Sequence, residues 1–203
     1  MDKEQILEKY GKDSYQVDED TFRMGIHQKL SDRIAKRFQK YHTVLDTCAG
    51  AGFMTIAIAK EVEKVIAVDI DETHLNQAKA NAELDAVDSK ITFIKGNVLE
   101  ELNKLDNIDA AFLDPDWARP GDDKAIHVRE LADMEPSGQI LFDEVSKKTK
   151  NICLRLPKEF DLSKLKHLPT HECEAFYQSD KLKFYCVYFG DLIMKEGSTE
   201  FKI

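Results

Sequence analysis

Residues 44–52, Val44-Leu45-Asp46-Thr47-Cys48-Ala49-Gly50-Ala51-Gly52, decide the fold of this chain. An apolar run leads into an acid and then into a turn with two glycines, and a helix-compatible stretch follows. Glycine lets the backbone turn tightly and approach a ligand without a Cβ in the way. The first glycine of the GxGxxG pattern, which receives a pyrophosphate, is replaced here by Cys48. On its own, the motif therefore fits a plain strand-to-helix turn as well as a ligand loop.

Short apolar runs and helix-compatible stretches alternate through the middle of the chain. Asp71 and Ser137 are favourable N-caps for two of the helices. Strands that are apolar on both faces and alternate with helices indicate a mostly parallel sheet covered on both sides. The expected strands are 43–47, 65–69, 91–94, 110–113 and 151–156, and the expected helices are 28–41, 52–60, 71–84, 98–105 and 137–148.

The C-terminal part of the chain breaks this alternation. Residues 172–178 and 182–189 are β-branched or aromatic runs that flank Ser179-Asp180-Lys181, a hairpin signal. Two consecutive strands place one antiparallel strand in the sheet, which is typical of a methyltransferase and not of a nicotinamide-binding domain. We predict a Rossmann-like α/β class I methyltransferase fold with a seven-stranded sheet over residues 26–203, after a short N-terminal extension of residues 1–25.

The composition of the chain bears on which substrates, metals and membranes it could bind. The net charge is −9, from 29 basic and 38 acidic residues, which disfavours a long polyanion bound by charge alone. A local basic patch or a pocket for one nucleotide remains compatible with this balance. No run approaches the ~20 apolar residues of a membrane helix, and the start, Met1-Asp2-Lys3-Glu4, does not resemble a signal peptide. The scattered cysteines and histidines predict reduced thiols and no metal site, so we expect a cytoplasmic protein, or a nuclear one in a eukaryote.

Polar residues end the second and third strands at the edge where open α/β sheets bind ligands. Asp69 ends the second strand, where a carboxylate can accept both ribose hydroxyls of a nucleoside, and Asn97 follows the third strand near the expected adenine edge. S-adenosylmethionine carries no phosphate, so the looser glycine turn suits it better than a dinucleotide. The expected cofactor-binding residues are Asp46, Thr47, Cys48, Ala49, Gly50, Gly52, Asp69, Ile70, Asn97 and Val98.

The fourth strand leads into Asp114-Pro115-Asp116-Trp117. Pro115 holds Asp114 extended, so that the carboxylate projects from the strand end. An activated methyl donor mainly requires alignment of the acceptor, and Asp114 could orient an exocyclic amine and relieve its developing positive charge. Trp117 could stack a base, most strongly a cationic one. Asp114, Pro115 and Trp117 are the candidate catalytic residues; a strand-terminating turn with a half-buried tryptophan is the alternative.

Over residues 22–192 the chain resembles the trimethylguanosine synthase family of RNA cap guanine-N2 methyltransferases. The later segments of this resemblance lie outside the general methyltransferase motifs and are therefore the more discriminating ones. The segments that carry it are 46–52, 65–71, 80–83, 114–117, 146–152, 156–157 and 188–193.

The resemblance implies a cofactor site for S-adenosylmethionine around Asp46 and Asp69. It also implies that Trp117 stacks the target guanine, which in the cap is N7-methylated and cationic. The nucleophile, the N2 amine, would then lie near Asp114 and Pro115.

The chain departs from the family pattern at several positions. Asp116 replaces the second proline of a Pro-Pro-Trp sequence, Ala118 and Arg119 replace two glycines, and Asn97 stands where an acid is usual. Three hypotheses follow. The chain methylates guanine N2 of an RNA or cap-like nucleotide, or it methylates a small molecule or a protein amine. In the third, it binds S-adenosylmethionine without catalysis and acts through a partner.

Overall fold

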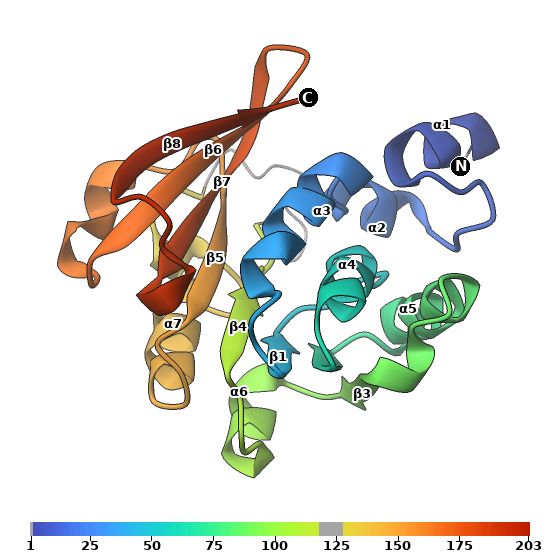
Figure 1. The fold of residues 1–203 in the computed structure, drawn as a ribbon, viewed down its shortest axis with the longest axis horizontal. Helices are drawn as coiled ribbons and strands as arrows, with labels where there is room; N and C mark the ends of the chain where they lie inside the picture. The colour runs from blue at the N-terminus through green and yellow to red at the C-terminus, as the bar shows by residue number, and fades with distance from the viewer. Residues whose placement is uncertain (1, 118–127) are drawn as a thin grey trace. The chain divides into compact units, whose positions relative to one another are not determined.

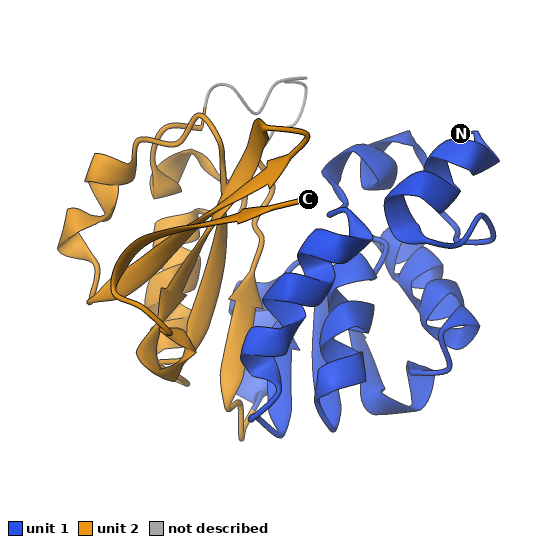
Figure 2. Ribbon diagram, turned by 45° about the horizontal axis from the view of Figure 1, so that its top comes forward, with its two compact units in different colours: residues 1–105 blue, residues 106–203 orange. Residues whose placement is uncertain are grey.

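The computed structural model describes residues 2–117 and 128–203, so Ala118 and Arg119 lie outside the described residues. The chain forms two compact units, residues 1–105 and 106–203 (Figure 2). In both, strands alternate with helices, and the expected Rossmann-like α/β architecture is confirmed (Figure 1).

The first unit contains a parallel sheet with strand order β3-β2-β1. Val65 on the middle strand lies opposite Val44 on one side and Ile91 on the other. Val44, Val65 and the neighbouring strand residue Ala67 are fully buried, which explains the continuous apolar runs in the sequence. The strands are β1 (Thr43–Asp46), β2 (Lys64–Asp69) and β3 (Ile91–Lys95), and the helices between them are α4 (Phe53–Glu61) and α5 (Glu72–Leu84).

Two of the expected helices in this unit are shorter than predicted. The stretch 28–41 forms α3 (Gln28–Ala35) and then a 3-10 turn, η1 (Lys36–Phe38), and α3 lies beside α4 (Figure 1). The stretch 98–105 likewise forms α6 (Val98–Glu101) and then η3 (Leu102–Lys104). Another 3-10 turn, η2 (Asp88–Lys90), precedes β3.

The N-terminal residues pack onto α4 and α5. They form α1 (Lys3–Tyr10), which ends at Gly11 as expected, and α2 (Glu19–Met24), a polar helix that was not predicted. Tyr10 stacks on Phe53 of α4, with 3.6 Å between ring centroids. Asn81 of α5 accepts from the Gln16 N–H at 2.7 Å and donates to the Ala51 carbonyl at 3.0 Å. The segment proposed as an extension is thus tied to the glycine turn through one side chain.

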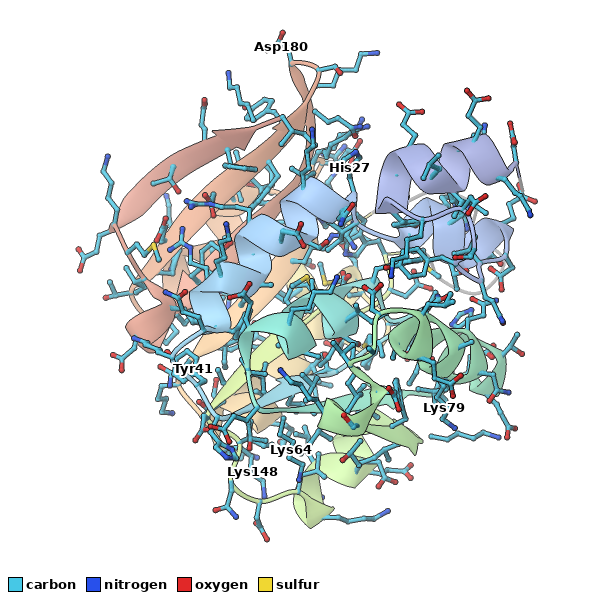
Figure 3. The ribbon with its side chains drawn as sticks, turned by 45° about the vertical axis from the view of Figure 1, so that its right-hand side comes forward. His27, Tyr41, Lys64, Lys79, Lys148 and Asp180 are labelled. Carbon is cyan, nitrogen blue, oxygen red and sulfur yellow. The ribbon has the colours of Figure 1, made fainter. Side chains whose placement is uncertain are left out.

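The second unit contains strands in the order β4-β5-β7-β6-β8. Strand β7 runs antiparallel to both β5 and β6, so the predicted hairpin is confirmed, and Asp180 lies at its tip (Figure 3). Ser179 and Asp180 adopt positive φ angles of 49° and 59°, as a tight hairpin turn requires. The strands are β4 (Ala110–Leu113), β5 (Ile152–Pro157), β6 (His171–Gln178), β7 (Lys181–Phe189) and β8 (Gly197–Lys202), with helical elements η5 (Leu131–Asp133), α7 (Gly138–Ser146), η6 (Leu162–His167) and η7 (Gly190–Leu192).

Strand β8 brings the described strands to eight, one beyond the expected seven, and the buried carboxylate of Glu172 holds the chain that leads into it. Glu172 is 1% exposed and accepts hydrogen bonds from the Met194 and Lys195 backbone N–H groups and the Thr199 hydroxyl. The sequence of β8 is mostly polar and exposed, with Phe201 as its one large apolar residue, so it lacked the apolar run of the other strands.

Candidate functional site

Backbone hydrogen bonds fasten the glycine turn to the carboxyl end of β2. The Ala49 N–H donates to the Val68 carbonyl at 3.0 Å, and the Gly50 N–H donates to Asp69 Oδ2 at 2.7 Å. The Gly96 N–H in turn donates to the Asp69 carbonyl at 3.0 Å. The ends of the first three strands, which the sequence predicted as one ligand edge, are therefore joined around Asp69.

The two glycines of the turn differ in what requires them. Gly52 has φ +84°, and a Cβ added there would lie 2.8 Å from the Ala78 Cβ on α5. Gly52 thus allows both the turn and the close contact between helices. Gly50 has φ +52°, and a Cβ there would meet no described atom within 4 Å. Of the two glycines in this turn, Gly50 is the one with room for a ligand beside its backbone.

The other predicted turn residues are mostly enclosed. Asp46 is 1% exposed, and its Oδ2 accepts from the Thr55 hydroxyl at 2.6 Å. Thr47 and Ala49 are buried, and Cys48 is half-buried. Asp46 therefore ties the end of β1 to α4 in addition to any role toward a ligand.

Asp69 carries several contacts at once. Its Oδ1 accepts from the Asp71 N–H at 2.9 Å, and it lies 3.7 Å from His74 Nδ1. The Asp69 carboxylate raises the pKa of His74, and partial burial of the imidazole opposes that rise. Ile70 is 72% exposed. A carboxylate and an exposed apolar surface thus lie at adjacent positions.

Asn97 has a structural task that the sequence interpretation did not assign. Its side-chain oxygen accepts from the Leu99 N–H at 3.0 Å and caps α6. Asn followed three residues later by Glu100 is a capping-box pattern and could have indicated this role. Val98 is buried.

The three candidate catalytic residues lie in the second unit, directly after β4. Asp114 Oδ2 accepts from Arg155 Nη1 at 2.7 Å, and the two side chains are 18% and 9% exposed. Burial raises the pKa of Asp114, and the positive charge of Arg155 opposes this rise. Pro115 is buried and Trp117 is half-buried, which fits both a stacking role for the tryptophan and the alternative of a packing residue.

Arg155 joins the candidate residues into one cluster, although the sequence interpretation missed it. Its guanidinium carbon lies 4.3 Å from the Trp117 ring centroid and 4.7 Å from that of Phe184. One cation therefore pairs with the carboxylate and lies close to two aromatic rings. The signal was a charged residue inside an otherwise apolar strand run.

The basic residues after α7 are engaged locally. Lys147 pairs with Glu144 at 2.6 Å, and Lys150 donates to the Ser146 carbonyl at 2.7 Å near the helix C-terminus. These contacts fit the expected complement to the helix dipole. Within residues 2–117 and 128–203, no group of three or more His, Cys, Asp or Glu side chains could hold a metal ion. Within the same ranges, no helix has the length and apolar character to cross a membrane.

Comparison with known families identifies the sequence class. The model of a family described as RNA cap guanine-N2 methyltransferase matches residues 41–192, most of the chain. An uncharacterized RNA methyltransferase of Synechocystis sp. is 29% identical over 114 residues, which cover 53% of this chain and 24% of that protein. A release factor glutamine methyltransferase of Flavobacterium psychrophilum is 33% identical over 95 residues, which cover 46% of this chain and 32% of that protein. The chain thus spans about a quarter to a third of these relatives' lengths.

Solved structures share the fold. A putative methyltransferase from Porphyromonas gingivalis W83 superposes with a TM-score of 0.78 and 19% identity, covering 93% of this chain and 47% of the other. A METTL16 methyltransferase domain superposes with a TM-score of 0.64 and 17% identity, covering 92% of both chains. The predicted methyltransferase fold is thereby confirmed.

Proposed function

Because this chain belongs to the RNA cap guanine-N2 methyltransferase family, we propose that it transfers a methyl group from S-adenosylmethionine to an exocyclic amine, guanine N2 of an RNA or nucleotide. The observation that carries the proposal is the grouping of Asp114 and Trp117 after β4 around one guanidinium. This pair lies within the residues that the family model matches. Its chemistry suits a planar base that bears an amine.

The residues around Asp69 fit the proposed cofactor. Each oxygen of the Asp69 carboxylate accepts one backbone N–H and has a further lone pair for a ribose hydroxyl. The exposed side chain of Ile70 would pack on the adenine, with Asn97 and Val98 near its edge. Gly50 would let the ligand approach the turn, of which Asp46, Thr47, Cys48, Ala49 and Gly52 are the remaining proposed members.

When bound, S-adenosylmethionine supplies an electrophilic methyl group on a sulfonium, so the protein's task is to align the acceptor. Asp114 would accept a hydrogen bond from the amine and offset the positive charge that develops on nitrogen. Pro115 holds the backbone beside Asp114 extended. Trp117 would stack the base and fix the plane of the amine.

A methyl-transfer assay tests the proposal. Purified protein would be incubated with isotope-labelled S-adenosylmethionine and with RNA, guanosine nucleotides or a cap dinucleotide, and the methylated nucleosides identified by mass spectrometry. We expect label at guanine N2. Asp114→Asn should lower kcat, whereas the matched variant of the exposed neighbour, Asp116→Asn, should retain it. Transfer to none of these acceptors would contradict the acceptor half of the proposal.

A protein amine or amide is the second candidate acceptor. Relatives of this chain include release factor glutamine methyltransferases and, at 31% identity over 91 residues, a ribosomal protein L11 methyltransferase of Syntrophomonas wolfei. The net charge of −9 also suits a substrate other than a long polyanion. Label in protein and not in RNA would select this candidate. Cofactor binding without transfer to any acceptor would select the non-catalytic hypothesis.

A further inference from the structure

We propose that Asn81 of α5 is a positioning residue for the cofactor, because it holds the glycine turn in one shape. This role rests on the proposed function, since it requires S-adenosylmethionine to bind beside that turn. It also gives a task to residues 12–18, which we call the N-terminal strap and which link α1 to α2 (Figure 1). The strap fixes the side chain of Asn81, and Asn81 fixes the turn.

The N-terminal residues contact one face of α5 at two successive helical turns. Asn81 accepts from the Gln16 N–H at 2.7 Å and donates to the Gln16 carbonyl at 2.9 Å. Gln77 donates to Asp18 Oδ2 at 2.8 Å and accepts from the Thr21 hydroxyl at 2.9 Å. Residues four apart lie on the same face of a helix. The two side chains therefore bind the same N-terminal region in a similar way.

Asn81 differs from Gln77 by a third contact, which reaches the glycine turn. Its Nδ2 also donates to the Ala51 carbonyl at 3.0 Å, and the side chain is 0% exposed. The amide thus uses both of its N–H donors and its oxygen at once. A rotation of this buried amide would break hydrogen bonds that water cannot replace there. The strap therefore keeps Asn81 oriented toward the turn.

The peptide between Ala51 and Gly52 is the part of the turn that Asn81 holds. Its N–H donates to the Ala49 carbonyl at 2.9 Å, a contact inside the turn, and its carbonyl accepts from Asn81. Gly50 and Gly52 have φ angles of +52° and +84°, and glycine gives a backbone unusual conformational freedom. A contact from outside the turn is therefore needed to select one orientation of this peptide.

The shape of the turn matters for the ligand because Gly50 precedes this peptide. The Gly50 N–H donates to Asp69 Oδ2 at 2.7 Å, and the space beside Gly50 is open. A turn that visits other shapes would lose this hydrogen bond and close part of that space for some of the time. Apparent affinity falls in proportion to the fraction of molecules in the binding-competent shape.

Titration calorimetry with S-adenosylhomocysteine tests this role. Asn81→Ala should raise Kd about fivefold to tenfold, because it removes the hydrogen bond that selects the shape of the turn. Gln77→Ala is the matched control: it removes two contacts with the N-terminal region and none with the turn, so Kd should stay within about twofold. In methyl-transfer assays, Asn81→Ala should raise KM for S-adenosylmethionine by the same factor and leave kcat within about twofold.

A folded Asn81→Ala protein with the Kd of the parent would overturn the role. An equal loss of affinity in Gln77→Ala would also overturn it, because seating of the strap in general would then explain both results. A parent protein that does not bind S-adenosylhomocysteine would overturn the proposed cofactor together with this role. Normal binding by the parent without an effect of Asn81→Ala would overturn this role alone.

The wild-type protein provides a test that needs no folded variant. Coupling between two sites is reciprocal, so a ligand that needs the held turn should stabilise the contact between Asn81 and the strap. NMR hydrogen exchange under native conditions measures this for single amides. With S-adenosylhomocysteine, the Gln16 N–H should exchange at least about threefold more slowly. The Gly25 N–H, which donates to the Thr21 carbonyl, should change less. Unchanged exchange at Gln16, or equal slowing at both amides, would contradict the coupling.

Discussion

Asp69→Ala is the substitution that most directly tests the proposed cofactor site. The Asp69 carboxylate accepts the Gly50 and Asp71 N–H groups at 2.7 and 2.9 Å. Hydrogen bonds to a charged group contribute about 1.5–3 kcal/mol each. Both N–H groups are only partly buried and can rehydrate, so we expect a loss of about 2–3 kcal/mol in the free energy of unfolding.

Asp69→Ala should weaken ligand binding more than it lowers the free energy of unfolding. If the same carboxylate also accepts two ribose hydroxyls, its removal costs about 3–6 kcal/mol of binding, or roughly a hundredfold to ten-thousandfold in Kd. Titration calorimetry with S-adenosylhomocysteine measures Kd, and urea unfolding measures stability. Asp69→Asn retains one carbonyl acceptor and should fall between the parent and Asp69→Ala.

Asp71→Ala is the control for loop integrity. The Asp71 side chain caps α5 by accepting from the Thr73 N–H at 2.6 Å, so its loss should cost about 1 kcal/mol of stability. Its effect on Kd should be no more than a few-fold. If folded Asp69→Ala binds S-adenosylhomocysteine within about threefold of the parent, the ribose role is wrong. If Asp71→Ala weakens binding equally, the shape of the loop and not the carboxylate is responsible.

Four further substitutions test the fold and its pH dependence. Gly52→Ala should destabilise the protein by about 2–4 kcal/mol in urea unfolding, because it adds a Cβ at positive φ and 2.8 Å from the Ala78 Cβ. The same change at Gly50, which has open space, should cost only about 1 kcal/mol. Glu172→Ala removes three accepted hydrogen bonds and should cost about 3 kcal/mol and increase hydrogen exchange in β8; normal exchange there would contradict this role. The pKa of His74 is raised in the folded state. Protonated His74 therefore contributes fully to the free energy of unfolding below its unfolded pKa of about 6.5, and this contribution is lost as the pH rises through the folded pKa. His74→Gln should therefore destabilise more at about pH 5.5 than at about pH 8.5, and an equal loss at both would refute the linkage.

The strands that sequence predicted best are those buried on both faces. Val44, Val65, Ala111 and Leu154 are fully buried, and their runs lacked the alternation of a half-exposed strand. Strand β8 was missed because, apart from Phe201, its residues GSTEFK are polar or glycine and mainly exposed, and pairing with β6 makes them a strand. Local pattern therefore finds strands that form the core, whereas strands stabilised by backbone pairing at an edge leave little trace in composition.

In the candidate site, too, the sequence located some residues but did not reveal all of their contacts. Asp69 and the glycine turn could be predicted because each follows an identifiable strand, and the hydrogen bond between Gly50 and Asp69 joins them. The neighbour of Asp69 in α5, His74, could not be identified, since its contact depends on how that helix begins. Asn97 was recognised as a strand-end residue, but its oxygen caps α6. Their positions after predicted strands identified Asp69 and Asn97 from the sequence. Their contacts depend on the local backbone geometry, which the sequence did not show.

Arg155 shows which additional information would have completed the acceptor cluster. It is 41 residues after Asp114, and its position inside an apolar run gave no indication of a partner. Strands β4 and β5 are parallel neighbours, and Leu113 lies opposite Leu154. In that register the next residue of each strand is Asp114 and Arg155, so their pairing follows from the alignment of the two strands. A shift by one residue would turn Arg155 to the other face of the sheet and remove it from both Asp114 and Trp117. The grouping of Asp114, Arg155 and Trp117 therefore depends on the register of β4 and β5.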